Sequence, residues 1–257
     1  MIIKTDRELK TYQTACNLSM QILKRLTFSV KPGMLPIEVD NLAKKLCREN
    51  QVKPAFLGVG QPQYPNASCV CVNDAAVHCI PNQTEKFKIG DLVKIDFGII
   101  YQGFYTDFCV TVAVGKFIDK ISKKLVETAK QAVKASIKAA IPGNFTGDIG
   151  HIMHSIALSN GFDVLKRYTG HGIGHTLHDQ PSIPAHGQPK TGVPFIKGQV
   201  VCLEAQIVEK SDEVAVGTDG WTVSTVDHGR VAMFEYMVVV DNPPLVLSPT
   251  FNWPLIV

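Results

Sequence analysis

The sequence lacks the features that mark membrane, nucleic-acid-binding and secreted proteins. No apolar run approaches the roughly 18 residues that a membrane-spanning helix requires. Lysine and arginine total 26 against 23 aspartate and glutamate, and no block of consecutive basic residues accompanies this net charge of +3. The opening residues, MIIKTDRELK, are too polar for a secretory signal. These absences predict a cytoplasmic globular protein with no membrane partner and no specific nucleic-acid partner.

Cysteine pairs suited to a structural zinc site are also missing. The seven cysteines are odd in number, and Cys69-x-Cys71 has no second pair at zinc-finger spacing. We therefore expect a reducing compartment in which the cysteines are small buried apolar residues. Other catalytic motifs fail as well: there is no G-x-S-x-G elbow, and Asp96-Phe97-Gly98 lacks the glycine-rich loop and HRD segment of a kinase.

Helical and strand-like segments follow one another in an order that occurs twice. The capping-box pattern Thr5-x-x-Glu8 predicts a first helix, and a second helix follows it. Residues 68–114 have strand-like patterns, with a hairpin turn at Tyr101-Gln102-Gly103. Two more helices follow, the second capped by Thr146 and running to Gly161, and strands close the chain.

This order predicts an α+β protein made of two similar halves, about 1–115 and 116–257. In each half the helices would pack on an antiparallel sheet. No long Gly/Ser-rich or Pro-rich linker separates the halves, which favours one fused domain over residues 1–257.

Four carboxylates, Asp96, Asp107, Glu204 and Glu235, lie inside otherwise apolar, strand-like runs. Burying an unpaired carboxylate costs several kcal/mol or more, so buried charges are expected to be paired or to coordinate a metal. No lysine or arginine flanks Asp107 or Glu235. With the neutral imidazole of His171, which lies in a glycine-rich turn, the four carboxylates would balance two divalent ions. The sequence predicts a dinuclear metal site.

Strand alternation predicts how these carboxylates are oriented. In a hairpin with a two-residue loop, side chains whose residue numbers have an odd sum share a face, which places Asp96 and Asp107 together unless a bulge near Gly103 intervenes. The alternative for this pair alone is a solvated sheet face. Glu204 and Glu235 alternate onto apolar faces that should turn inward, where a carboxylate is a metal ligand, a raised-pKa acid or half of an ion pair.

Histidines offer further candidate ligands. The segment GHGIGHTLHDQP contains three, but its glycines exclude a regular helix as the frame, and only some of the three need touch metal. His151 and His154 are spaced i, i+3 on a predicted helix, with no local carboxylate partner beyond Asp148. We interpret them as structural.

Six short segments, in order and spacing, resemble the type I methionine aminopeptidases, metallopeptidases of family M24 with the pita-bread fold. They are HCIP around His78, KIDFG around Asp96, TDF around Asp107, GHGIGHTLH from Gly170 to His178, LEA around Glu204 and FEY around Glu235. The resemblance covers nearly the whole chain. It implies two divalent ions, chosen among Mn, Fe, Co and Zn, with the ligands Asp96, Asp107, His171, Glu204 and Glu235.

The resemblance also implies a reaction, in which metal-activated water attacks the first peptide bond. Glu204 would act as general base and proton shuttle, His178 would stabilise the tetrahedral intermediate, and His78 would contact the substrate's peptide nitrogen. The substrates would be the N-termini of nascent proteins with a small second residue. We expect a monomer, in which any ribosome contact uses the folded surface. The methionine slot would be lined by Phe56, Tyr64, Cys69, Leu177 and Trp221.

Five positions depart from the family's usual residues, and none is a predicted ligand. They bear on pocket shape, metal preference and substrate range: Cys79 replaces Gly, Asp179 replaces Glu, Ala205 replaces Pro, Met233 replaces Gln and Tyr236 replaces His.

Two alternatives stay open. A Xaa-Pro aminopeptidase of the same fold shares the five ligands but usually carries a large amino-terminal domain, whereas about four residues precede the first capping box here. A non-catalytic pita-bread binding protein would generally have lost ligands. A type II methionine aminopeptidase is disfavoured because the interval from His178 to Glu204 is too short for its helical insertion.

Overall fold

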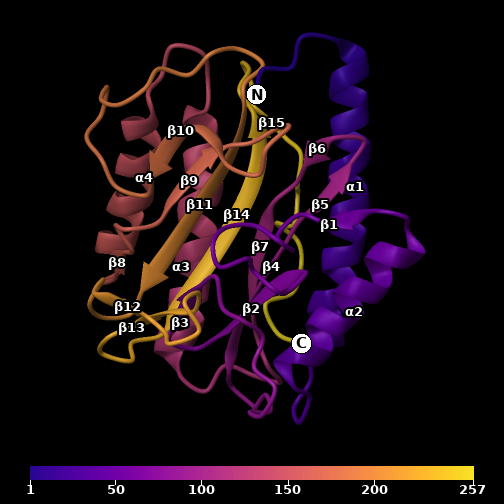
Figure 1. Ribbon diagram of the computed structural model, residues 1–257. Coiled ribbons are helices and arrows are strands. Elements are labelled where there is room, and N and C mark those ends of the chain that lie inside the picture. The colour runs from indigo at the N-terminus through magenta and orange to yellow at the C-terminus, as the bar shows by residue number, and fades with distance from the viewer.

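One large antiparallel sheet contains strands from both halves of the chain (Figure 1). The computed structural model describes residues 1–257. Along the sheet the strands run in the order β10 (Asp179–Pro184), β9 (Thr169–Gly172), β11 (Val200–Val208), β14 (Val231–Val239), β7 (Phe108–Ala113), β4 (Leu92–Phe97) and β2 (Ser68–Val72). Two short strands extend it, since β8 (Asp163–Val164) pairs with β11 and β15 (Leu245–Val246) with β14.

Four helices pack on this sheet in two pairs. Helices α1 (Asp6–Ser29) and α2 (Pro36–Glu49) contact the strands of the first half, and α3 (Lys120–Ser136) and α4 (Thr146–Ser159) contact those of the second. The predicted α+β class is confirmed. The strands of both predicted halves join in a common sheet, so each helix pair packs on its own part of it. None of the helices combines the length and the apolar character that crossing a bilayer demands.

The helix ends test the capping predictions. The capping box of α1 is present, because the Glu8 amide donates to Thr5 and the Glu8 carboxylate accepts from the Thr5 amide at 3.0 Å. The predicted Thr146 cap of α4 is wrong. Thr146 is already helical and its hydroxyl accepts from the Val193 amide, while the carboxylate of Asp148 receives the free amide before the helix. The helix ends at Ser159, two residues before the predicted end.

The hairpin that carries the first two acidic residues is bent in the middle. Its turn, Gln102-Gly103, has positive φ at both residues (49° and 83°), as a type I′ turn requires. Next to the turn, β5 (Ile99–Tyr101) and β6 (Phe104–Tyr105) join β1 (Lys53–Pro54) in a small sheet. At the bend a Cβ on Gly98 would overlap the Thr106 carbonyl oxygen, so only glycine fits.

Beyond this bend the register of β4 and β7 places Asp96 opposite Cys109. Asp107 is two residues from Cys109 and therefore shares its face with Asp96. The odd-sum prediction is confirmed, because the bend keeps the parity.

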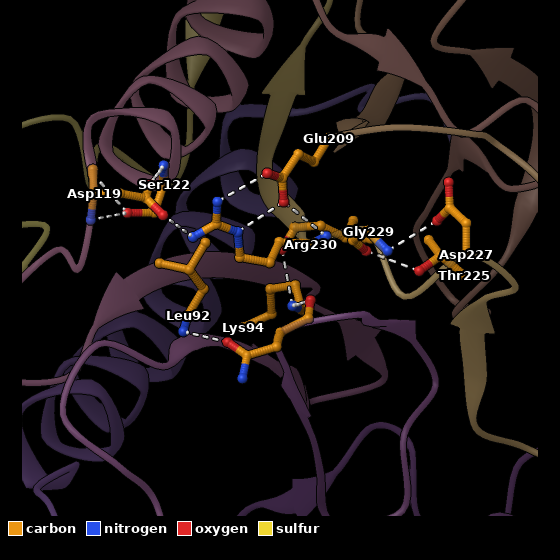
Figure 2. Close-up of polar contacts among 11 residues, drawn as sticks. Leu92, Lys94, Asp119, Ser122, Glu209, Thr225, Asp227, Gly229 and Arg230 are labelled. Carbon is orange, nitrogen blue, oxygen red and sulfur yellow. Dashed lines mark hydrogen bonds and ion pairs between the residues drawn. The ribbon is translucent and has the colours of Figure 1, made fainter.

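A second small sheet and a charged network lie at the other end of the large sheet. The small sheet contains β12 (Val214–Val216), β13 (Val223–Thr225) and β3 (Ala75–Val77). In the network, Arg230 donates to both carboxylate oxygens of Glu209 at 2.7 and 2.8 Å and to Asp119 at 2.9 Å (Figure 2). Below it, the buried ammonium of Lys94 donates to the carbonyl oxygens of Asn73 and Val231 at 2.8 and 2.9 Å.

The interior is one main apolar cluster of 64 buried residues contributed by both halves. All seven cysteines are free and buried, which confirms their predicted place as small core residues.

Candidate metal centre

A cavity of about 450 Å³ opens over the middle of the large sheet. Nineteen residues line it, and they include all twelve residues that the sequence singled out. These twelve are Phe56, Tyr64, Cys69, His78, Asp96, Asp107, His171, Leu177, His178, Glu204, Trp221 and Glu235.

Four strands, and the residue just before a fifth strand between them, supply the five candidate ligands. In register, Glu204 on β11 faces Glu235 on β14, Glu235 faces Cys109, and Cys109 faces Asp96 on β4. On the other side of β11, His171 of β9 faces Cys202, which alternation puts on the Glu204 face. Asp107 directly precedes β7. Residues spread over the chain therefore converge on one face because sheet pairing, not sequence distance, sets their spacing.

The oxygen and nitrogen atoms of this cluster lie close enough to share an ion. One carboxylate oxygen from each of Asp96, Asp107 and Glu235 lies within 4.8 Å of the others. The Nε2 atom of His171 is 3.7 Å from Asp107 Oδ2 and 3.9 Å from Glu235 Oε1. The Nδ1 atom of His171 is 2.9 Å from the Gly172 carbonyl oxygen, which only accepts, so Nδ1 carries the proton and Nε2 faces the carboxylates with a lone pair.

Several oxygens of the cluster have no partner within the protein. Asp96 Oδ1, Asp107 Oδ1 and Glu235 Oε1 are buried and accept no hydrogen bond, and none of the four carboxylates pairs with a lysine or arginine. Glu204 accepts a hydrogen bond from the amide of Gln206, two residues along the same strand. An unsatisfied set of oxygens and one imidazole lone pair is the donor set that divalent ions bind.

Burial and mutual repulsion perturb the titration of these groups. Burial raises the pKa of Asp96 to about 7, and burial followed by the charge of Asp96 raises that of Glu204 to about 8. Burial, and then neighbouring carboxylates, raise the pKa values of Asp107 and Glu235 well above their usual range. Burial lowers the pKa of His171 to about 4. The protein itself therefore disfavours the charged form of every member, and a bound cation would reverse this preference.

The two candidate catalytic histidines flank the cluster. The ring of His178 lies edge-on to that of His171, with centroids 4.5 Å apart. His78 has a positive φ of 56° and its ring lies edge-on to Tyr168 and Trp221, at 5.3 and 6.2 Å. Burial lowers the pKa of both histidines, that of His78 to about 4, so both rings are neutral near pH 7.

The remaining histidines that the sequence raised lie away from the cavity. His175 lies 3.0 Å from the Gly103 carbonyl oxygen, so the GHGIGHTLH segment places two of its three histidines on the cavity wall. His154 contacts Asp163 at 2.9 Å. Asp163 lies beyond the end of α4 and is not a local partner, so the sequence did not indicate this contact, and His154 does not line the cavity.

An apolar slot adjoins the cluster. Phe56, Tyr64, Cys69 and Leu177 are buried, and the ring of Trp221 lies edge-on to Tyr64 with centroids 5.1 Å apart. Of the five departures from the family pattern, only Met233 lines the cavity. The sequence did not indicate six wall residues, namely Val59, Gly60, Val77, Arg167, Tyr168 and Thr169. Tyr168 and Thr169 directly precede the Gly170-His171 segment, which was the available signal.

Comparisons with known proteins agree on one family. The family model described as metallopeptidase family M24 matches residues 10–242. A methionine aminopeptidase of Aquifex aeolicus is 34% identical over 251 residues, covering 95% of this chain and 97% of the relative. Methionine aminopeptidase 1 of Bacillus subtilis is 32% identical, covering 94% and 96%.

Solved structures give the same result. The methionine aminopeptidase of Thermotoga maritima superposes with a TM-score of 0.91 at 36% identity, covering 96% of this chain and 99% of that one. An Xaa-Pro dipeptidase from Bacillus anthracis has a TM-score of 0.78 at 20% identity, and the match covers 64% of its chain. The second likeness shows a shared fold alone.

Proposed function

Since the chain belongs to the methionine aminopeptidases of metallopeptidase family M24, we propose that it removes the initiator methionine from nascent proteins whose second residue is small. The predicted type I resemblance and the pita-bread fold are confirmed by these likenesses. One observation carries the proposal: the large sheet brings four carboxylates and an imidazole to one face, with three oxygens unpartnered, beside an apolar slot.

We propose two divalent ions, among Mn, Fe, Co and Zn, held by Asp96, Asp107, His171, Glu204 and Glu235. The residues fit this group because the unpartnered oxygens and the inward lone pair of His171 need a cation, and four carboxylates match the charge of two. When bound, the ions would supply Lewis acidity, which lowers the pKa of water and stabilises negative charge on a carbonyl oxygen.

The chain's own residues would handle the protons. Glu204 would accept a proton from the attacking water and deliver it to the leaving amine, and the Gln206 amide holds the orientation of its carboxylate. His178, neutral near pH 7, would donate to the developing oxyanion. His78, also neutral, has an unprotonated ring nitrogen that would accept from the substrate's peptide N–H.

The slot formed by Phe56, Tyr64, Cys69, Leu177 and Trp221 would select the first side chain. Its aromatic rings and thiol suit an unbranched thioether. The free α-amino group would lie at the metal centre, which restricts cleavage to the first residue. We further propose that residues 1–257 act as a single-domain, cytoplasmic monomer, whose two halves divide near residue 116.

The Xaa-Pro aminopeptidase alternative is less well supported, because the prolidase likenesses show the fold alone and the matches cover about two thirds of those chains. A non-catalytic binding role is disfavoured by the complete set of five candidate ligands.

The direct test uses protein stripped with a chelator and resupplied separately with Mn, Fe(II), Co and Zn. We expect metal-dependent release of methionine from Met-Ala-Ser and none of the first residue from a Xaa-Pro peptide. Elemental analysis of the active form should give two ions per chain, and the matched Glu204→Gln variant should be inactive while folded. Cleavage of the Xaa-Pro peptide alone would transfer the assignment to the alternative, and one ion per active chain would overturn the dinuclear proposal.

A further inference from the structure

Arg167 is the only lysine or arginine among the nineteen residues that line the cavity. It is exposed at the point where β9 is about to begin, and it takes part in no ion pair. Its neighbour Lys166 is also exposed, but it pairs with Asp163 at 3.2 Å and Asp212 at 3.0 Å and does not line the cavity. The guanidinium of Arg167 is therefore free to meet an anion that arrives with a substrate.

A series of contacting aromatic rings runs along the cavity wall from the buried slot toward the protein surface. Tyr64 lies against Trp221 at 5.1 Å, Trp221 against His78 at 6.2 Å, and His78 against Tyr168 at 5.3 Å. Arg167 follows, since it is adjacent to Tyr168 in the chain and its positive charge opposes the rise that burial gives the pKa of Tyr168. Along this series the residues change from buried at Tyr64 to half-buried at Trp221, His78 and Tyr168 and exposed at Arg167.

A bound peptide would follow the same direction. With its first side chain in the slot at Tyr64 and its first peptide nitrogen at His78, the rest of the peptide would run past half-buried Tyr168 toward exposed Arg167. This step rests on the proposed function, because that function places the peptide's first residue.

We propose that Arg167 is a specificity-determining residue that binds a carboxylate of the substrate downstream of the cleaved bond. Two sources supply this chemistry: an acidic side chain beyond the second residue of a nascent protein, or the terminal carboxylate of a short peptide. We expect this contact to add equally to ground-state and transition-state binding, in which case it changes KM and leaves kcat unaltered.

The test compares kcat/KM for four matched peptides on the metal-loaded protein. Met-Ala-Asp-amide and Met-Ala-Asn-amide isolate the side-chain source, and Met-Ala-Ser with a free or an amidated terminus isolates the terminal carboxylate. Wild type should favour the carboxylate-bearing member of at least one pair by about two- to fivefold, the range of an exposed ion pair, through KM. Raising the salt to 0.5 M should abolish the preference.

Three variants separate the outcomes. Arg167→Gln should abolish the preference, and the control Lys166→Gln should retain it. Arg167→Glu should reverse it, so that this variant prefers a fifth, basic peptide, Met-Ala-Lys-amide, over Met-Ala-Asp-amide. The inference is overturned if methionine is released but the ratios are the same in wild type and Arg167→Gln, or if Lys166→Gln has the same effect. Absence of methionine release from all peptides would instead overturn the proposed function itself.

Discussion

Two regions of this protein, on β4 and at β14, each place a satisfied charge close to an unsatisfied one. On β4, Lys94 donates to two backbone carbonyl oxygens, whereas Asp96, two residues along, keeps a buried oxygen without a partner. Arg230, the residue before β14, is held by Glu209 and Asp119 (Figure 2). Glu235, within β14, has no cation from the chain.

The difference separates structural charges from functional ones. This fold can neutralise a partly buried charge with its own groups, as the Arg230 network shows. Where it leaves several carboxylates together without a cation, the partner must come from outside. Breaking each cluster should therefore have opposite effects on activity and on stability.

The largest effect is expected from Asp107→Asn, which removes one charge from the metal centre at almost constant shape. Methionine release should fall by about a thousandfold or more, because one change disables the whole centre. In chelator the variant should melt at or above the wild-type temperature, since a buried repelling charge has gone. Peptide assays and thermal melts check both. Activity within tenfold of wild type would contradict the comparison, as would a lower melting temperature in chelator.

The opposite result is expected from Arg230→Met. Glu209 and Asp119 would lose the hydrogen bonds of their cation, which should lower the free energy of unfolding by about 1.5–3 kcal/mol, while the kcat of the folded, metal-loaded protein stays within about threefold. Urea unfolding measures the stability. Arg25→Met is the control, because Arg25 lies 3.9 Å from Glu49 in an exposed pair and its loss should cost under about 0.5 kcal/mol. Equal losses in the two variants would refute the structural role.

The metal-free protein should also become less stable as pH rises from 6.5 to 8. Asp96 and Glu204 have folded-state pKa values raised to about 7 and about 8, so the folded protein keeps protons that the unfolded chain has already released. The stability from these protons is complete below the unfolded pKa, near 4, and is lost as pH rises through 7 and 8. Melts in chelator should fall by about 5 °C over this range.

The metal-loaded protein provides the control for this pH series, because its ligands are already deprotonated and metal affinity rises with pH. Its melting temperature should be constant or increase from pH 6.5 to 8. Parallel curves with and without metal would show that other groups cause the dependence.

The smallest effect is expected from Lys94→Met. The change removes two hydrogen bonds to carbonyl oxygens but keeps a buried aliphatic chain, which should cost about 1–2 kcal/mol. The number of bound metal ions should be unchanged, because Lys94 donates to backbone carbonyl oxygens and not to the carboxylates of the metal centre. A changed number of bound metal ions would show that Lys94 also affects the metal centre, and would contradict the separation of structural from functional charges.

The sequence could predict the candidate site well because its signal is local. A carboxylate inside an apolar strand is visible without knowing its neighbours, and alternation alone placed Asp96 and Asp107 on one face. The partners of these residues were not visible. Three features depend on which segments meet in space. They are the contact of His154 with Asp163, the hydrogen bond from the Val193 amide to the Thr146 hydroxyl, and the position of Arg167 on the cavity wall.

The pairing of Glu235 with Cys109 joins the last of the five candidate ligands to be synthesised to a hairpin that is synthesised much earlier. Asp96 and Asp107 belong to one hairpin and can meet soon after they leave the ribosome, but His171 and Glu204 follow much later and Glu235 last of the five. A partly made chain therefore has acidic residues in place without the set needed to hold an ion firmly. Only a chain in which β14 has paired with both β11 and β7 would bind metal firmly. Metal binding would therefore mark the completion of folding.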